Sequence, residues 1–180
     1  MSTPTQATAS DAAALAAKEL FARVFVPVDF TQSSQQAVGI ALELKRVFGS
    51  EVCLFQLAEE GGADEFLGGL GDPATPGDLV RNARERLERF VENIAPGSAG
   101  AVEVRARADV KPMEDLREEA RRWGATLVVA ATTFRGFFRS PAEKLVHGFD
   151  IPVLLIPAVE EETDLGLPRT RPRGRPAPGL

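Results

Sequence analysis

The sequence has little of the chemistry that most metal and catalytic sites need. It contains one cysteine, Cys53, and one histidine, His147, among 180 residues. A single cysteine excludes a disulfide framework or a cysteine-based metal cluster within one chain. A single histidine excludes the usual histidine-rich zinc sites. Because no nucleophile–base pair or carboxylate pair emerges either, we expect no enzymatic activity and no bound metal.

Long apolar runs are also missing. No stretch approaches the roughly 18–20 apolar residues that a membrane-spanning helix needs. Residues 1–20 lack both the basic start and the apolar core of a signal peptide. The scarcity of cysteine is typical of a reducing compartment. We therefore expect a soluble, cytoplasmic protein with no membrane partner.

Basic residues are concentrated near the end of the chain. The net charge is -5, but residues 1–168 hold 17 basic against 26 acidic residues, a net charge of about -9. This acidic body argues against a nucleic-acid-binding face. The remaining four basic residues would give modest, salt-sensitive binding to nucleic acid or would simply keep the tail soluble, which we favour. They are Arg169, Arg171, Arg173 and Arg175.

Apolar runs that predict buried strands alternate with amphipathic stretches that predict helices. The strands are expected at 24–28, 52–57, 102–108, 127–131 and 153–156. This alternation predicts an α/β fold: a single doubly wound, five-stranded parallel sheet with helices on both faces, in the flavodoxin-like layering of nucleotide-binding proteins.

Helix boundaries are marked by capping residues. The first helix of this unit begins at Thr31 or Ser33, with Ser33 and Gln36 in capping-box spacing, and it ends at Gly49. Later helices are expected to start at Thr75-Pro76, at Pro112 and at the capping box of residues 140–143.

We expect three regions along the chain. Residues 1–20 form an arm that is disordered or a short helix, and residues 21–158 form the α/β domain. Residues 159–180 are rich in arginine and proline and are expected to be disordered.

Three segments resemble the universal stress protein family. RVFVPVDFTQSSQQAVGIALELKRVFGSEVCLFQL resembles its first strand, helix and second strand, and VKPMEDLREEARRWGATLVVAAT its third helix and fourth strand. SPAEKLVHGFDIPVLLIP resembles its last helix and strand. The resemblance spans Arg23 to Pro157 and implies a stress-response domain that forms a homodimer along the edge of its last strand.

Nucleotide-binding members of that family carry Gly-x-x-Gly, nine residues and then Gly-Ser or Gly-Thr. When this motif is aligned with the chain, Ala131 and Phe134 stand in place of the first two glycines, and Arg139-Ser140 stands in place of the final pair. Only four residues, instead of nine, lie between Phe134 and Arg139. Phosphate loops need glycine so that bare backbone N–H groups can approach the oxygens. We therefore predict that the standard ATP site is lost and that no cofactor is bound.

Some residues that could still contact an adenine nucleotide or an anion are present in the sequence. If an adenine nucleotide binds, the resemblance assigns its contacts to Val28, Asp29, Ala131 and Ser140. Asp29 has two interpretations, because an aspartate at a strand end either holds an adenine or ribose or caps the following helix. Candidate contacts to a phosphate or another anion are Arg135, Arg139 and Lys144, which are more often simply solvated.

Two segments suggest contacts between proteins. Phe134, Phe137 and Phe138 either fill the vacated pocket or form an exposed patch for a protein partner. Three aromatic rings in so short a loop do not all point inward, so we favour at least one at an interface. The last strand is short and apolar, which predicts a dimer edge. This edge consists of Val153, Leu154, Leu155 and Ile156.

The favoured hypothesis is a non-catalytic, dimeric stress-response or regulatory module that acts through protein interaction. The alternative is a nucleotide-binding stress sensor with a rebuilt site and at most slow hydrolysis.

Overall fold

The computed structural model describes residues 9–58, 75–108, 112–132 and 148–157. The helices of these segments are α1 (Ala9–Leu20), α2 (Gln32–Phe48), α3 (Pro76–Ile94) and α4 (Pro112–Trp123), with a short 3-10 turn at Ala99–Ala101. The strands are β1 (Arg23–Pro27), β2 (Glu51–Ala58), β3 (Glu103–Ala108), β4 (Leu127–Ala131) and β5 (Val153–Ile156). Within these segments, no helix is long and apolar enough to cross a membrane.

The five strands form one parallel sheet in the order β3-β2-β1-β4-β5, which confirms the predicted fold class. This is the 3-2-1-4-5-6 order of the dinucleotide-binding fold without its sixth strand, whereas flavodoxin has the order 2-1-3-4-5. The chain first adds strands on one side of β1 and then crosses to the other side. The direction of winding therefore reverses between β1 and β4.

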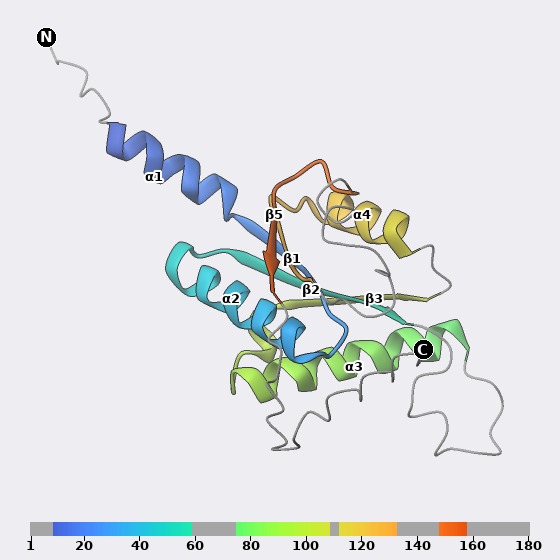
Figure 1. Ribbon diagram of the computed structural model, residues 1–180. Coiled ribbons are helices and arrows are strands. Elements are labelled where there is room, and N and C mark those ends of the chain that lie inside the picture. Colours follow the sequence, from blue (N-terminus) through green and yellow to red (C-terminus); the bar gives the residue numbers. More distant parts are fainter. Residues whose placement is uncertain (1–8, 59–74, 109–111, 133–147, 158–180) are drawn as a thin grey trace, which may run out of the picture.

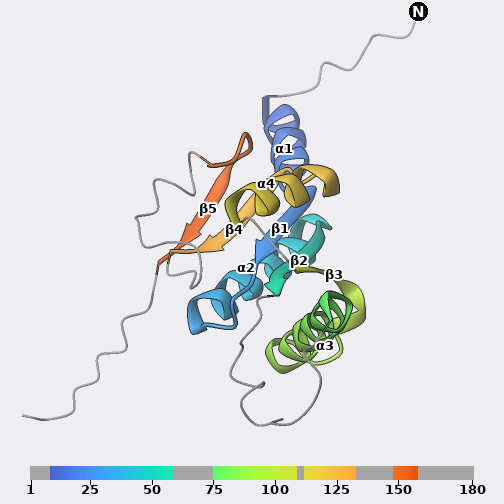
Figure 2. The ribbon, with the colours of Figure 1, turned by 90° about the vertical axis from the view of Figure 1, so that its right-hand side faces the viewer.

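Helices cover both faces of the sheet, as Figures 1 and 2 show. Successive side chains of a strand point to opposite faces of the sheet. Each inner strand therefore contributes side chains to two separate hydrophobic cores, one on each face. One core joins Val24 and Leu54 to Leu87 of α3 and to α2, and the other joins Phe25 to Leu116 of α4. Burial on both faces explains why the strands appear in the sequence as continuous apolar runs.

The structure decides between the two caps predicted for α2, Thr31 and Ser33. Thr31 is the N-cap, and its side-chain oxygen accepts a hydrogen bond from the backbone N–H of Ser34 at 3.2 Å. Ser33 lies inside the helix and is buried. The predicted capping box between Ser33 and Gln36 is therefore wrong. The predicted helix end is confirmed, because Gly49 takes the left-handed conformation with φ of 74°.

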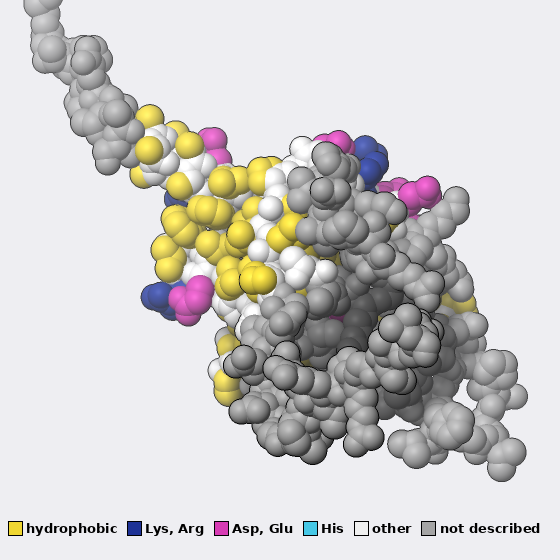
Figure 3. Space-filling view, viewed as in Figure 1, with side chains coloured by type: hydrophobic (Ala, Val, Ile, Leu, Met, Phe, Trp, Pro, Cys, Tyr) yellow, Lys and Arg dark blue, Asp and Glu magenta, His cyan; other side chains and the backbone are white. Residues whose placement is uncertain are grey.

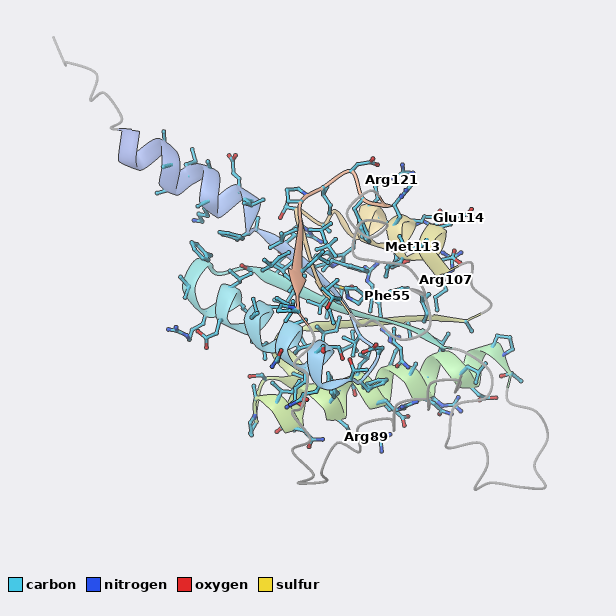
Figure 4. The ribbon with its side chains drawn as sticks, in the orientation of Figure 1. Phe55, Arg89, Arg107, Met113, Glu114 and Arg121 are labelled. Atoms are coloured by element: carbon cyan, nitrogen blue, oxygen red, sulfur yellow. The ribbon has the colours of Figure 1, made fainter. Side chains whose placement is uncertain are left out.

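The β3 edge of the sheet carries charged side chains that are paired with α4. Arg105 contacts Glu119 at 2.6 Å, and Arg107 contacts Asp115 at 2.9 Å. Figure 4 shows Arg107 extending from β3 towards α4. Burial opposes the charge of Glu103, but hydrogen bonds from Arg105 and from the Trp123 indole outweigh it and keep the pKa of Glu103 below its usual value.

Two glycines of the α2 segment allow a matched test of backbone conformation. A methyl group added at Gly39 or Gly49 would meet no atom within 4 Å, so only conformation distinguishes the two sites. Gly49→Ala should lower the free energy of unfolding by about 1 kcal/mol, because a side chain disfavours the left-handed region. Gly39→Ala should raise it by roughly 0.5–1 kcal/mol, because alanine is the better helix former. Urea unfolding curves that shift in the same direction for both variants would contradict this account.

Candidate functional site

The sheet offers one end where a ligand crevice is expected. In open α/β sheets, ligands bind outside the carboxyl ends of the strands at the point where the winding reverses. β1 and β4 are paired neighbours at that point. Val28 and Asp29 follow β1, and Ala131 is the last residue of β4. The structure therefore places three of the predicted nucleotide contacts at the carboxyl ends of these two strands.

The backbone on both sides of this site is held by the neighbouring strands. The N–H of Val28 donates to the carbonyl of Phe55 at 2.8 Å, and the N–H of Thr132 donates to the carbonyl of Ile156 at 2.9 Å. Val28 and Ala131 are both buried. The methyl group of Ala131 therefore lies within the packed sheet.

Asp29 takes part in the turn that leads into α2. Its Oδ1 accepts hydrogen bonds from the hydroxyl of Thr31 at 2.6 Å and from the backbone N–H of Thr31 at 3.1 Å. Thr31 in turn caps α2 and accepts at its carbonyl from the hydroxyl of Ser34 at 2.9 Å. Asp29 therefore stabilises the helix start through the cap residue, while its role in binding a ligand stays a prediction.

Phe30 is an unusual residue at the same turn. Its φ is 60°, and no other non-glycine residue among those described has a positive φ. A bulky side chain in this region costs about 1–2 kcal/mol. The ring packs edge-on against Phe90 at 5.2 Å, and the guanidinium of Arg86 lies 4.5 Å above it. These contacts with α3 offset the strain and fix the direction in which the chain leaves β1.

Sequence reasoning did not find the role of Phe30. Nothing in the local pattern distinguishes a phenylalanine in the left-handed region from one in an extended turn. The partners Arg86 and Phe90 lie far along the chain on another helix, so only the tertiary structure brings them together.

The loop and helix predicted after β4 lie outside the described residues. The predictions made for them therefore stay predictions. They concern the nucleotide contact Ser140, the anion contacts Arg135, Arg139 and Lys144, the partner patch Phe134, Phe137 and Phe138, and also His147.

Reactive chemistry is sparse in the segments that the structure describes. They contain no group of three or more histidine, cysteine or acidic side chains that could hold a metal ion. Cys53 lies buried in β2, where burial, with a further contribution from the charge of Glu103, raises the pKa of its thiol to about 12. The thiol therefore stays protonated at neutral pH and acts as a core residue.

A second surface is formed by β5 and α2. Leu154 is 41% exposed, whereas Ile156 is buried at the end of the strand. Beside β5 lies a nearly apolar groove of about 480 Å³. We call the strand and this groove together the β5–α2 surface. Figure 3 shows hydrophobic side chains gathered on this side of the molecule. The groove is lined by Gln36, Gly39, Ile40, Glu43, Leu44, Val47, Phe48 and Ile156.

The strand order and the reversal of winding between β1 and β4 define a doubly wound, Rossmann-like α/β domain. Comparison with known protein families makes this more specific, since the sequence profile described as "Universal stress protein family" matches residues 20–157. The chain therefore belongs to the universal stress protein family. A comparison with curated proteins finds no significant match.

Solved structures of the family share the fold. A family member from Burkholderia pseudomallei is 26% identical, with a TM-score of 0.52 over 77% of this chain and 98% of that one. UspA from Lactobacillus plantarum is 17% identical, with a TM-score of 0.55 over 76% and 97%. A member from Archaeoglobus fulgidus, solved in complex with dAMP, is 20% identical, with a TM-score of 0.51 over 76% and 98%.

Glycine usually lowers stability relative to alanine, but the positive φ of Phe30 should reverse this order at position 30. Phe30→Ala and Phe30→Gly both remove the contacts with Phe90 and Arg86, so both should be less stable than the wild type. Only glycine also relieves the positive φ, so Phe30→Gly should exceed Phe30→Ala in free energy of unfolding by about 1 kcal/mol. Chemical denaturation would measure the difference, and a more stable alanine variant would show that the turn is not strained.

Proposed function

We propose that this member of the universal stress protein family is a non-catalytic, cytoplasmic homodimer that acts in stress response or regulation through protein contacts, without the standard ATP site. The observation that carries the proposal is the contrast between the two edges of the sheet. The strand at one edge carries charged side chains, which discourage strand pairing, whereas the strand at the other edge carries none.

The β3 edge is protected by charge. Glu103, Arg105 and Arg107 alternate along this strand, and their ion pairs with each other and with α4 keep charged groups at the edge. Charged side chains on an edge strand discourage another chain from adding to the sheet.

The β5 edge lacks any charged side chain. Its four residues are aliphatic, and it pairs with β4 on one side. An apolar, unprotected edge is a liability for a monomer. Antiparallel pairing with β5 of a second copy would satisfy the outer backbone groups and cover Leu154. The apolar groove of the β5–α2 surface continues this patch beyond the strand. Both features support a dimer formed along β5.

The dimer edge can be tested with a single exposed residue. Leu154→Lys places a charge on the outer side of β5 without disturbing the core, so it should convert the β5 dimer to a species of half its mass. Asn93→Lys is the matched control, because it adds the same charge at an exposed position of α3. Light scattering after size exclusion measures the mass. A Leu154→Lys protein with the mass of the wild type would rule out the strand-edge dimer.

The proposed loss of the ATP site is argued from the carboxyl end of β4, where the family's nucleotide motif would begin. Ala131 is fully buried there, and the phosphate cradle that the family motif requires is missing from the sequence that follows. The three phenylalanines of that loop, Phe134, Phe137 and Phe138, are proposed to contact a protein partner instead.

A nucleotide-binding sensor is the second candidate. It is supported by the position of Asp29 just after β1, the strand that pairs with β4, and by the dAMP in the structure of the relative from Archaeoglobus fulgidus. In this candidate Val28, Asp29, Ala131 and Ser140 contact the adenine nucleotide, and the rebuilt site supports at most slow hydrolysis.

Thermal unfolding separates the two candidates. A nucleotide present at a hundredfold excess over its dissociation constant would stabilise the folded protein by about 2.7 kcal/mol, a shift of several degrees in Tm. We expect no shift with millimolar ATP and Mg²⁺ or with dAMP. A clear shift that Asp29→Asn removes would replace the first candidate with the second.

A further inference from the structure

The segment that leads into β5 is held by one face of α4. Gly148 and Phe149 lie at the start of this segment, and both are buried. The Nε of Arg117 donates a hydrogen bond to the carbonyl of Gly148, and Phe149 belongs to the same hydrophobic core as Leu116. Leu116 and Arg117 follow Met113 by three and four residues, so these three residues share one face of α4. This face therefore positions the approach to β5.

The side chain of Met113 fills the space beside Gly148. A methyl group added at Gly148 would lie only 2.5 Å from the Cε of Met113. Carbon atoms that are not bonded to each other pack at about 3.5–4.0 Å. The end of the methionine therefore occupies the volume that a side chain at position 148 would take. Met113 also packs against the core that contains Phe149, so it joins the start of the segment to the apolar face of the sheet.

Met113 is also the sulfur atom that an oxidant reaches most readily among the described residues. It lies in the first turn of α4 and is partly exposed, as Figure 4 helps to locate. The other sulfur of these residues belongs to Cys53, which is fully buried and has a pKa raised to about 12 by burial. Oxidation of sulfur depends on exposure and, for cysteine, on the thiolate form. A protonated, buried thiol meets neither condition, whereas a thioether needs exposure alone.

We propose that Met113 is a site of reversible oxidation by peroxides, and that its oxidation releases residues 148–152 from α4. The S–O bond forms as the O–O bond of hydrogen peroxide breaks. The sulfur loses two electrons, the peroxide gains them, and the second oxygen leaves as water. The product is methionine sulfoxide, which a methionine sulfoxide reductase converts back to the thioether.

A sulfoxide is a poor occupant of this contact. Its S–O group is polar, and burying a polar group without a hydrogen bond costs free energy. If the oxidised Met113 turns towards water, the space beside Gly148 is emptied, and if it stays, it pushes Gly148 and Phe149 away from α4. Either movement loosens the approach to β5. Val153 and Leu155 of this strand pack on the same core, so the strand should loosen with it.

Oxidation should also weaken the proposed dimer, a consequence that rests on the proposed function. A β5 strand that opens more often offers its outer edge to a second copy for less of the time. Peroxide should therefore shift the protein from the dimer towards the monomer, and the reductase should reverse the shift.

Hydrogen exchange before and after treatment with hydrogen peroxide tests the opening. Once mass spectrometry shows the sulfoxide at Met113, the amides of residues 148–156 should exchange on the order of tenfold faster in the full-length protein, because local opening sets their exchange rate. The amides of α3 should keep their rates. Treatment with the reductase should restore slow exchange.

Met113→Leu is the matched control. Leucine has a similar volume and is tolerated in methionine positions, but it has no sulfur. The variant keeps Met1 and Cys53, so any effect of oxidation at those two residues remains in the control. Its exchange at residues 148–156 should be the same with and without peroxide.

Two results would overturn the role of Met113. One is a Met113 that stays unoxidised in the folded protein while free methionine in the same solution is converted. The other is a sulfoxide at Met113 with unchanged exchange at residues 148–156.

Light scattering on the same samples separates this inference from the proposed dimer. A wild type that is monomeric before treatment contradicts the β5 dimer, and the exchange comparison still decides the role of Met113. A dimer that keeps both its mass and its slow exchange after oxidation overturns the role of Met113 and leaves the dimer standing.

Discussion

Strand β1 is the element on which the rest of the molecule depends. It pairs with β2 on one side and β4 on the other, and Val24, Phe25 and Val26 are fully buried. Because it is covered on both faces and at both edges, its side chains set the two cores. Its carboxyl end marks the reversal of winding. The position of Asp29, the strain of Phe30 and the direction of α2 all follow from how the chain leaves this strand.

The amino end of the same strand fixes α1. Thr126 accepts from the backbone N–H of Arg23 at 2.9 Å and donates to the carbonyl of Leu20, so one side chain joins the start of β1, the end of α1 and the region before β4. The arm and the candidate ligand site therefore lie at opposite ends of one central strand.

The sequence predicted most of the fold because buried parallel strands and amphipathic helices have strong local patterns. Runs such as 127–131, capping residues such as Thr31 and the helix end at Gly49 depend on near neighbours in the chain. The order of the strands depends on which strands pair across long separations, and no local pattern specifies that order. The sequence also left two caps open for α2. The structure has Thr31 as the cap, while Ser33 is a buried residue within the helix.

The candidate site was predictable only in part. Asp29 and Ala131 were assigned from the resemblance to the family, and the structure places them at the carboxyl ends of the adjacent strands β1 and β4. Phe30 was missed because its conformation is stabilised by Arg86 and Phe90 on a distant helix. The exposure of α1 could not be predicted either, because an alanine-rich sequence is equally compatible with a packed helix.

The central claim is that the apolar β5 edge is covered by a second copy whereas the charged β3 edge is not. Hydrogen exchange at the backbone amides of the two edge strands tests this most directly. The account predicts that the outward-facing amides of β5 exchange slowly, close to the rate of β1, and lose this protection on dilution, while those of β3 exchange fast at all concentrations. Equally fast exchange at both edges in concentrated protein would contradict it.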